Sequence, residues 1–218
     1  MMDFSGAIQT LSVAAIPILF AITLHEVAHG WAAKLRGDRT AEMLGRLSLN
    51  PIKHIDPVGT VAVPVLMVLT TGFMFGWAKP VPVAFNNLNN PKKDMVFVAF
   101  AGPVANVVMA LFWAVILKLV FVSGGAGGPV SDFIYQMARI GIFFNVLLAV
   151  FNLLPIPPLD GGRVLRGLVN ESIGRVLDRL EPFGLIIVVG LLLLGWLFPL
   201  VQPAMDFLQR LILALVGL

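Results

Sequence analysis

Long apolar stretches separated by short charged segments dominate this chain. The runs extend from about Ile8 to Leu35, Asp94 to Val122, Ser131 to Leu154, Phe183 to Leu200 and Met205 to Leu218. Most of them approach or exceed the roughly 20 residues that a helix needs to cross the hydrocarbon core of a bilayer. The pattern predicts an all-α polytopic membrane protein with about five to six transmembrane helices.

One further apolar run, from Val58 to Ala78, differs from the others because proline and several glycines interrupt it. The loop that follows it, at residues 77–93, is rich in proline and asparagine. Both features disfavour a regular helix. We therefore expect a re-entrant or extended segment near residues 58–85, with both of its ends on the same side of the membrane.

Composition agrees with a lipid environment. The 218 residues are 58% hydrophobic and 12% charged, with a mean hydropathy of +0.93, which lies outside the range of soluble domains. The chain has no cysteine, so a thiolate metal site and a cysteine nucleophile are excluded. Any metal must be held by nitrogen and oxygen ligands.

Positive charge is concentrated in three loops. Residues 34–56, 79–94 and 163–181 hold 12 of the 15 Lys and Arg residues. Basic residues in short loops between apolar runs mark the cytosolic side of a membrane protein, and this pattern is more consistent with orientation than with nucleic-acid binding. We expect a multi-pass protein of the cell membrane with these loops in the cytoplasm and with no nucleic-acid partner.

The first apolar run contains the sequence His25-Glu26-Val27-Ala28-His29. Residues four apart share one face of a helix, so both imidazoles can bind a single zinc ion while Glu26 acts as a base toward its water. The alternative is that these residues only mark the membrane interface, but ionisable residues inside a membrane are costly and usually functional. The motif predicts a hydrolytic zinc site below the membrane surface.

A catalytic zinc needs a third protein ligand, and Asp160, His54 and Asp56 are the candidates. Asp160 directly follows an apolar run that ends in prolines. It could instead serve as an Asx turn or a helix N-cap. The polar Asn152, eight residues earlier and still inside the apolar run, favours a functional role for Asp160.

Three segments together, HEVAH, AGPVAN at 101–106 and NLLPIPPLDG at 152–161, resemble the site-2 protease family of intramembrane zinc metalloproteases. The resemblance covers about residues 15–165 and is to a compact prokaryotic branch without PDZ or CBS domains. It implies one Zn²⁺ per chain with His25, His29 and Asp160 as ligands, Glu26 as general base, and Asn152 holding substrate or stabilising the oxyanion. His54 would support or gate the site, or cap its loop.

The resemblance implies a single intramembrane metalloprotease domain over residues 1–218, with a catalytic core at about 8–165 and C-terminal helices at 166–218. Its partners would be the lipid bilayer and the transmembrane segments of membrane-protein substrates, which it would hydrolyse at an active site toward the cytoplasmic side. Such a substrate has to unwind, and pairing as a strand near residues 79–85 would achieve this. The alternative is a non-proteolytic membrane metal-binding or metal-transport protein, which would not need Glu26 as a base.

Overall fold

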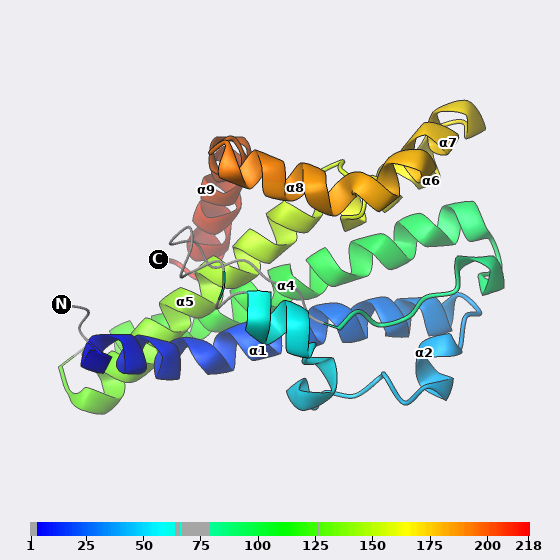
Figure 1. The fold of residues 1–218 in the computed structure, drawn as a ribbon. Helices are drawn as coiled ribbons and strands as arrows, with labels where there is room; N and C mark the ends of the chain where they lie inside the picture. The colour runs from blue at the N-terminus through cyan, green and yellow to red at the C-terminus, as the bar shows by residue number, and fades with distance from the viewer. Residues whose placement is uncertain (1–3, 64–65, 67–78, 126) are drawn as a thin grey trace.

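The computed structural model describes residues 4–63, 66, 79–125 and 127–218. Three long helices, α1 (Phe4–Leu35), α4 (Pro91–Val122) and α5 (Pro129–Asn152), lie side by side, and α8 (Gly184–Leu193) and α9 (Leu197–Leu215) cover one side of them (Figure 1). The shorter elements are α2 (Thr40–Met43), η1 (Pro51–His54), η2 (Pro57–Ala62), η3 (Phe85–Asn87), α6 (Asp160–Leu168), α7 (Glu171–Leu180) and η4 (Glu181–Phe183). The described residues contain no strand, and the prediction of an all-α polytopic membrane protein is confirmed.

Three helices are long and apolar enough to cross a membrane: Ser12–Leu35 within α1, α4 and α5. A fourth span is possible in length and composition if Glu171–Leu193 and α9 are taken together, although they are bent by 87°. The sequence led us to expect five to six spans; the described residues give three or four because the two C-terminal runs form one bent pair. Most of the run at 58–78 lies outside the described residues.

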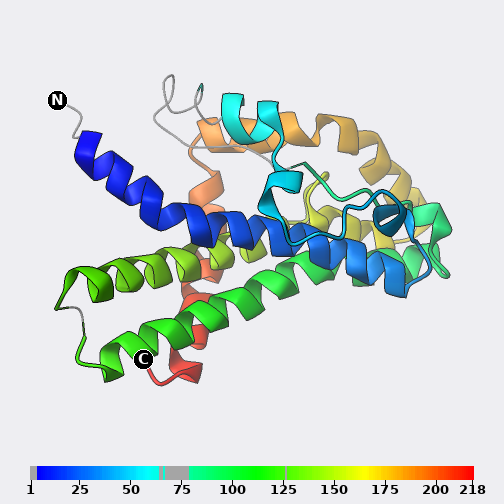
Figure 2. The same ribbon diagram turned by 90° about the horizontal axis from the view of Figure 1, so that it is seen from below.

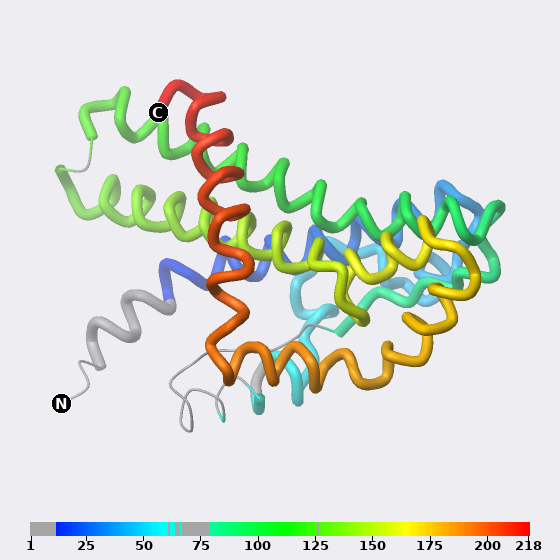
Figure 3. Tube along the Cα trace, turned by 90° about the horizontal axis from the view of Figure 1, so that it is seen from above, coloured from blue at the N-terminus to red at the C-terminus, as the bar shows by residue number. Residues whose placement is uncertain are grey.

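The bend between α8 and α9 has a local cause. Gly195 has a φ of +72°, in the left-handed region that glycine adopts without strain. The amide groups of Gly195 and Trp196 donate to the carbonyl groups of Leu192 and Leu191, which closes the end of α8. The chain then turns sharply, and α9 crosses over α4 and α5 (Figure 3).

Small residues allow α4, α5 and α9 to pack closely. Ala110, Ala114 and Ala138 are fully buried in the core between these helices. The indole ring of Trp113 lies so close to Gly141 that a Cβ atom there would be 2.4 Å from the ring. Helices in a membrane associate through such small residues because van der Waals packing replaces the hydrophobic driving force.

The loop between α2 and α4 returns along α1 as an extended segment over Lys79–Ala84 (Figure 2). The buried carboxylate of Asp38 holds this segment in place, because the carboxylate accepts hydrogen bonds from the amide groups of Ala84 (2.7 Å) and Thr40 (3.0 Å). The amide of Lys79 also donates to the carbonyl of His54 (2.9 Å). The described residues that flank the 58–78 run therefore lie together, as a re-entrant segment would require, and re-entry itself stays a prediction.

The basic loops gather at one end of the molecule. The end of α1, the short helix α2, the start of α4, and α6 and α7 all lie toward the same end in Figure 1. These elements contain or flank most of the cations that the sequence pattern assigns to the cytoplasm. The fold thus brings residues that are distant in sequence close to the N-terminal end of α6.

Candidate metal centre

Two imidazoles and one carboxylate meet inside the helix bundle. The Nε2 atoms of His25 and His29, one turn apart on α1, are 3.1 Å from each other. The Oδ2 atom of Asp160, in the first turn of α6, lies 3.2 Å from the first and 3.3 Å from the second. All three residues are buried, and their atoms form a cluster that could hold a metal ion.

The spacing and the donor set fit zinc. A tetrahedral zinc ion with bonds of 2.0–2.1 Å sets neighbouring ligand atoms about 3.3 Å apart, close to the three separations observed. The Oδ2 atom of Asp160 is buried and makes no hydrogen bond, which is costly for a carboxylate unless a cation lies beside it. Two neutral imidazoles and a carboxylate are a common catalytic set for this metal.

The loop before α6 delivers Asp160 to the histidines. The N-cap residue of α6 is Leu159, and Asp160 is the first residue of the helix itself. The alternative interpretation of Asp160 as an N-cap is therefore not supported. A Cβ atom at Gly161 would lie 2.2 Å from the carbonyl oxygen of Leu153, so glycine is needed there because the backbones approach closely.

The other ring nitrogens of the two histidines have fixed partners. The Nδ1 atom of His29 lies 2.8 Å from the carbonyl oxygen of Val98, and that of His25 lies 2.6 Å from the Oδ1 atom of Asn106. A carbonyl oxygen only accepts, so Nδ1 carries the proton in both rings. Both Nε2 atoms are then free to face Asp160 and a metal.

Asn106 is itself held by a buried amide relay. Its Nδ2 atom donates to the carbonyl of Ala21 (3.1 Å) and to the Oδ1 atom of Asn145 (2.9 Å). The Nδ2 atom of Asn145 donates to the carbonyl of Gly141 (2.8 Å). These donors fix the orientation of the Asn106 amide, so its oxygen must face His25.

Gly102 of α4 forms one wall of the metal centre. A Cβ atom at this position would lie 2.4 Å from the Nε2 atom of His29 and 2.6 Å from the Cε1 atom of His25. Only glycine lets the α4 backbone approach the two imidazoles this closely. The AGPVAN segment therefore contributes both this wall and, through Asn106, an orienting group.

A cavity of about 560 Å³ opens onto the cluster, and Glu26, Asn152 and the segment Pro80–Val83 line it together with the three ligand residues. The Oε2 atom of Glu26 accepts a hydrogen bond from the amide of Val81 (2.7 Å). The side chain of Asn152 donates to the carbonyl of Leu148 (3.0 Å). The three ligand residues thus share the cavity with a carboxylate, a side-chain amide and an extended backbone segment.

The structure brings five of the seven residues that the sequence singled out to one cavity: His25, Glu26, His29, Asn152 and Asp160. His54 and Asp56 are not part of the cluster. The Nε2 atom of His54 lies 2.8 Å from the carbonyl oxygen of Ser48, and Asp56 caps η2 through the amide groups of Val58 and Gly59.

Sequence reasoning missed the roles of Asn106, Asn145 and Val81. It used Asn106 as part of the AGPVAN segment and did not indicate that its side chain would bond to His25. A polar amide inside an apolar run was the available signal for both asparagines. No local pattern indicated that the amide of Val81 would meet Glu26.

Comparison with known proteins gives a consistent result. The profile of peptidase family M50 matches residues 13–140 and 127–195. YwhC of Bacillus subtilis, named as a candidate zinc metalloprotease, is 37% identical over 205 residues, which cover 92% of this chain and 90% of YwhC. Rip2 of Mycolicibacterium smegmatis, named in the same way, is 33% identical over 193 residues, covering 87% of this chain and 71% of Rip2. No solved structure matches the chain.

Proposed function

We propose that this chain, which belongs to peptidase family M50, is an intramembrane zinc endopeptidase that hydrolyses peptide bonds in or near the transmembrane segments of other proteins. Membership makes it a zinc metalloprotease, as the resemblance to the site-2 protease family implied. The observation that carries the proposal is the buried His25, His29 and Asp160 cluster, which opens onto the same cavity as Glu26 within a bundle of candidate spans.

We assign one Zn²⁺ to the three ligands. When bound, zinc supplies Lewis acidity, which acidifies water and polarises a carbonyl group. Glu26 is the proposed general base, because its carboxylate lines the cavity beside the ligands and can take a proton from the attacking water and pass it to the leaving amine. The Val81 amide holds the Oε2 atom of Glu26, whereas the Oε1 atom accepts no hydrogen bond from another described residue and can take this proton.

Asn152 is proposed to hold the substrate or to stabilise the oxyanion that develops on its carbonyl. Its Nδ2 atom uses one hydrogen for the carbonyl of Leu148, and the second hydrogen remains available toward the cavity. A donor aimed at a developing negative charge lowers the barrier of acyl transfer. With this assignment, the Asn152 amide and the Glu26 carboxylate of the cavity both have a proposed role.

Substrate binding is proposed to use the extended segment Pro80–Val83. A transmembrane helix shields its own peptide bonds, so it has to unwind before hydrolysis. The amide of Val83 makes no hydrogen bond with another described residue, and it borders the cavity. An unwound substrate could pair with this edge as an added strand.

We further propose that the active site faces the cytoplasm. The elements at the metal end include the start of α4 with Lys92 and Lys93, and the flanking loops hold most of the cations. The positive-inside rule assigns that end to the cytoplasm. A metal-transport role is less consistent with the chain, because membership of a peptidase family and a carboxylate base in the cavity both favour hydrolysis.

The test uses the purified full chain and a panel of single-span substrate proteins, with and without a zinc chelator. We expect cleavage that the chelator abolishes and that added zinc restores. The Glu26→Gln variant should keep its zinc and lose activity by about 10²- to 10⁴-fold. Equal turnover by this variant at equal metal content would refute the general-base assignment, and chelator-resistant cleavage would refute the zinc mechanism.

A further inference from the structure

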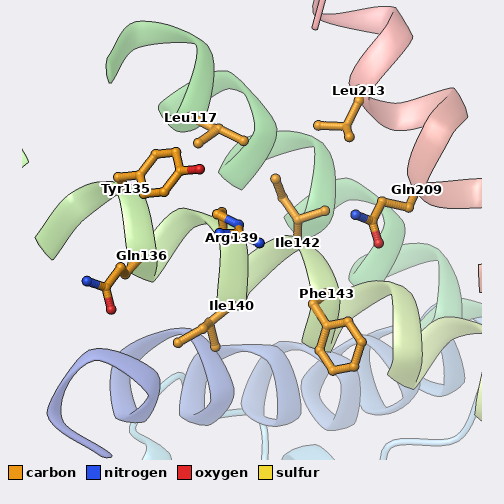
Figure 4. Close-up of a pocket in the computed structure, with 9 residues that line it drawn as sticks. All are labelled: Leu117, Tyr135, Gln136, Arg139, Ile140, Ile142, Phe143, Gln209 and Leu213. Atoms are coloured by element: carbon orange, nitrogen blue, oxygen red, sulfur yellow. The ribbon is translucent and has the colours of Figure 1, made fainter. Parts of the chain in front are cut away.

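A second cavity, of about 450 Å³, lies between α4, α5 and α9 (Figure 4). Its walls are mainly apolar and include Leu117, Phe143 and Leu213. Polar groups also border it: Arg139, Tyr135, Gln136 and Gln209. Arg139 belongs to α5, a candidate span, where a cation is costly unless it meets a partner or an aqueous path.

In the part of the chain that the structure describes, the side chains of these four polar residues donate no hydrogen bond to another residue. The guanidinium of Arg139 lies 5.6 Å from the centre of the Tyr135 ring, and it forms no ion pair with any carboxylate in the part of the chain that the structure describes. Figure 4 shows the Tyr135 hydroxyl, the Gln209 amide and the Arg139 side chain bordering the same space between α4, α5 and α9. A cation and two further donors therefore converge on one space.

The depth of the cavity follows from α4. Leu117 is 26 residues beyond Pro91, so it lies about 39 Å along the helix at 1.5 Å per residue. Gly102, which touches the metal ligands, is about 22 Å from Leu117 on the same helix. Arg139 is ten residues beyond Pro129, so it lies about 15 Å along α5. The cavity thus lies in the half of the helix bundle opposite the metal centre, and its cation lies inside a candidate span.

We propose that this cavity binds the phosphate of a membrane phospholipid, with one acyl chain along the apolar wall. The occupant has to offer an anionic acceptor for Arg139, Tyr135 and Gln209, and phosphate oxygens accept such charge-assisted hydrogen bonds. It also has to cover apolar surface that faces the bilayer, since Phe143 is 45% exposed. A phospholipid combines both parts, whereas a free anion offers only the first.

The test measures lipid binding by native mass spectrometry of the full chain in detergent. The probes are phosphatidylglycerol, diacylglycerol with the same acyl chains, and inorganic phosphate. We expect one phosphatidylglycerol to bind more tightly than either other probe. The Arg139→Gln variant should bind it at least about fivefold more weakly, because one cation near a lipid surface contributes that much. Arg139→Lys should lose less.

Arg210 provides the matched control, since it is an exposed cation on α9 that does not line the cavity. Arg210→Gln should bind phosphatidylglycerol like the unchanged protein. Equal loss in both variants, or none in Arg139→Gln, would overturn the site. If diacylglycerol bound as tightly as phosphatidylglycerol, recognition of the phosphate would be excluded. If inorganic phosphate bound as tightly, recognition of the lipid would be excluded. If Arg139→Gln does not fold, Gln209→Leu is held to the same criteria.

Discussion

The Nδ1 atom of His25 and the Oδ1 atom of Asn106 lie 2.6 Å apart, although 81 residues separate them in sequence. This contact joins the first span to the second at the metal centre. The relay behind Asn106 reaches α5 through Asn145. One proposed ligand is therefore oriented by three packed helices, so changes at a distance from the metal should alter how it binds.

Replacing Asn106 with leucine should weaken zinc binding about 10- to 100-fold, because the His25 Nδ1 proton loses its acceptor. Asn106→Asp keeps an acceptor oxygen and should retain more affinity. Competition with a chromophoric chelator measures the constants. The chain has only three histidines, so ¹⁵N NMR of labelled imidazoles reports each ring. Changes confined to His25 are expected, and unchanged spectra and affinity would argue against the relay.

Gly102→Ala should also impair metal binding, for a steric reason. Its Cβ atom would come within 2.4 Å of the His29 Nε2 atom, so the imidazoles or α4 must move. Gly190→Ala is the control, because a Cβ atom there meets nothing within 4 Å. Zinc content per chain after purification distinguishes the two. Full zinc occupancy in Gly102→Ala would contradict the close approach of α4.

Val83→Pro should slow cleavage of transmembrane substrates without removing zinc, because proline lacks the amide hydrogen that an added strand would use. Val83→Ala keeps that hydrogen and serves as the control for the lost side chain. We expect kcat/KM to fall only in the proline variant. Equal rates in all three proteins would exclude strand pairing at this position.

Asp38 should fasten the segment Lys79–Ala84 only while it is ionised. Burial raises the pKa of Asp38, but hydrogen bonds from Thr40, Ala84 and Asn87 lower it by more, so its pKa lies below the usual value. A lowered pKa means that the stabilisation is present above the unfolded pKa, near 3.9, and is lost as the pH falls through the folded value.

Asp38→Asn should therefore loosen the segment at neutral pH. A lost buried hydrogen-bond partner costs about 1–3 kcal/mol, so the Ala84 amide should exchange with solvent roughly 5- to 150-fold faster. Glu42→Gln is the control, because Glu42 pairs with Lys34 at the surface, where ion pairs contribute little. Unchanged exchange at Ala84 in Asp38→Asn would show that other contacts hold the segment.

The sequence predicted much of the fold because membrane spans have a local cause. Each apolar run has to satisfy its own backbone hydrogen bonds in lipid, so α4 and α5 form almost where the runs lie. The single-domain boundaries and the re-entry of 58–78 stay predictions. The bend at Gly195 was not expected. It depends on the αL conformation of this one glycine, and many other glycines in the chain do not adopt that conformation.

The sequence by itself determined the pairing of His25 with His29, because a spacing of four residues on a helix sets their distance without help from the rest of the chain. Residue chemistry alone left Asp160, His54 and Asp56 open, the family resemblance implied Asp160, and the tertiary structure places Asp160 beside the two histidines. It also decided that Asn106 orients His25 and that Val81 holds Glu26. These contacts depend on how separate helices and loops pack, and no periodicity along the chain encodes a distance between segments that meet only after folding.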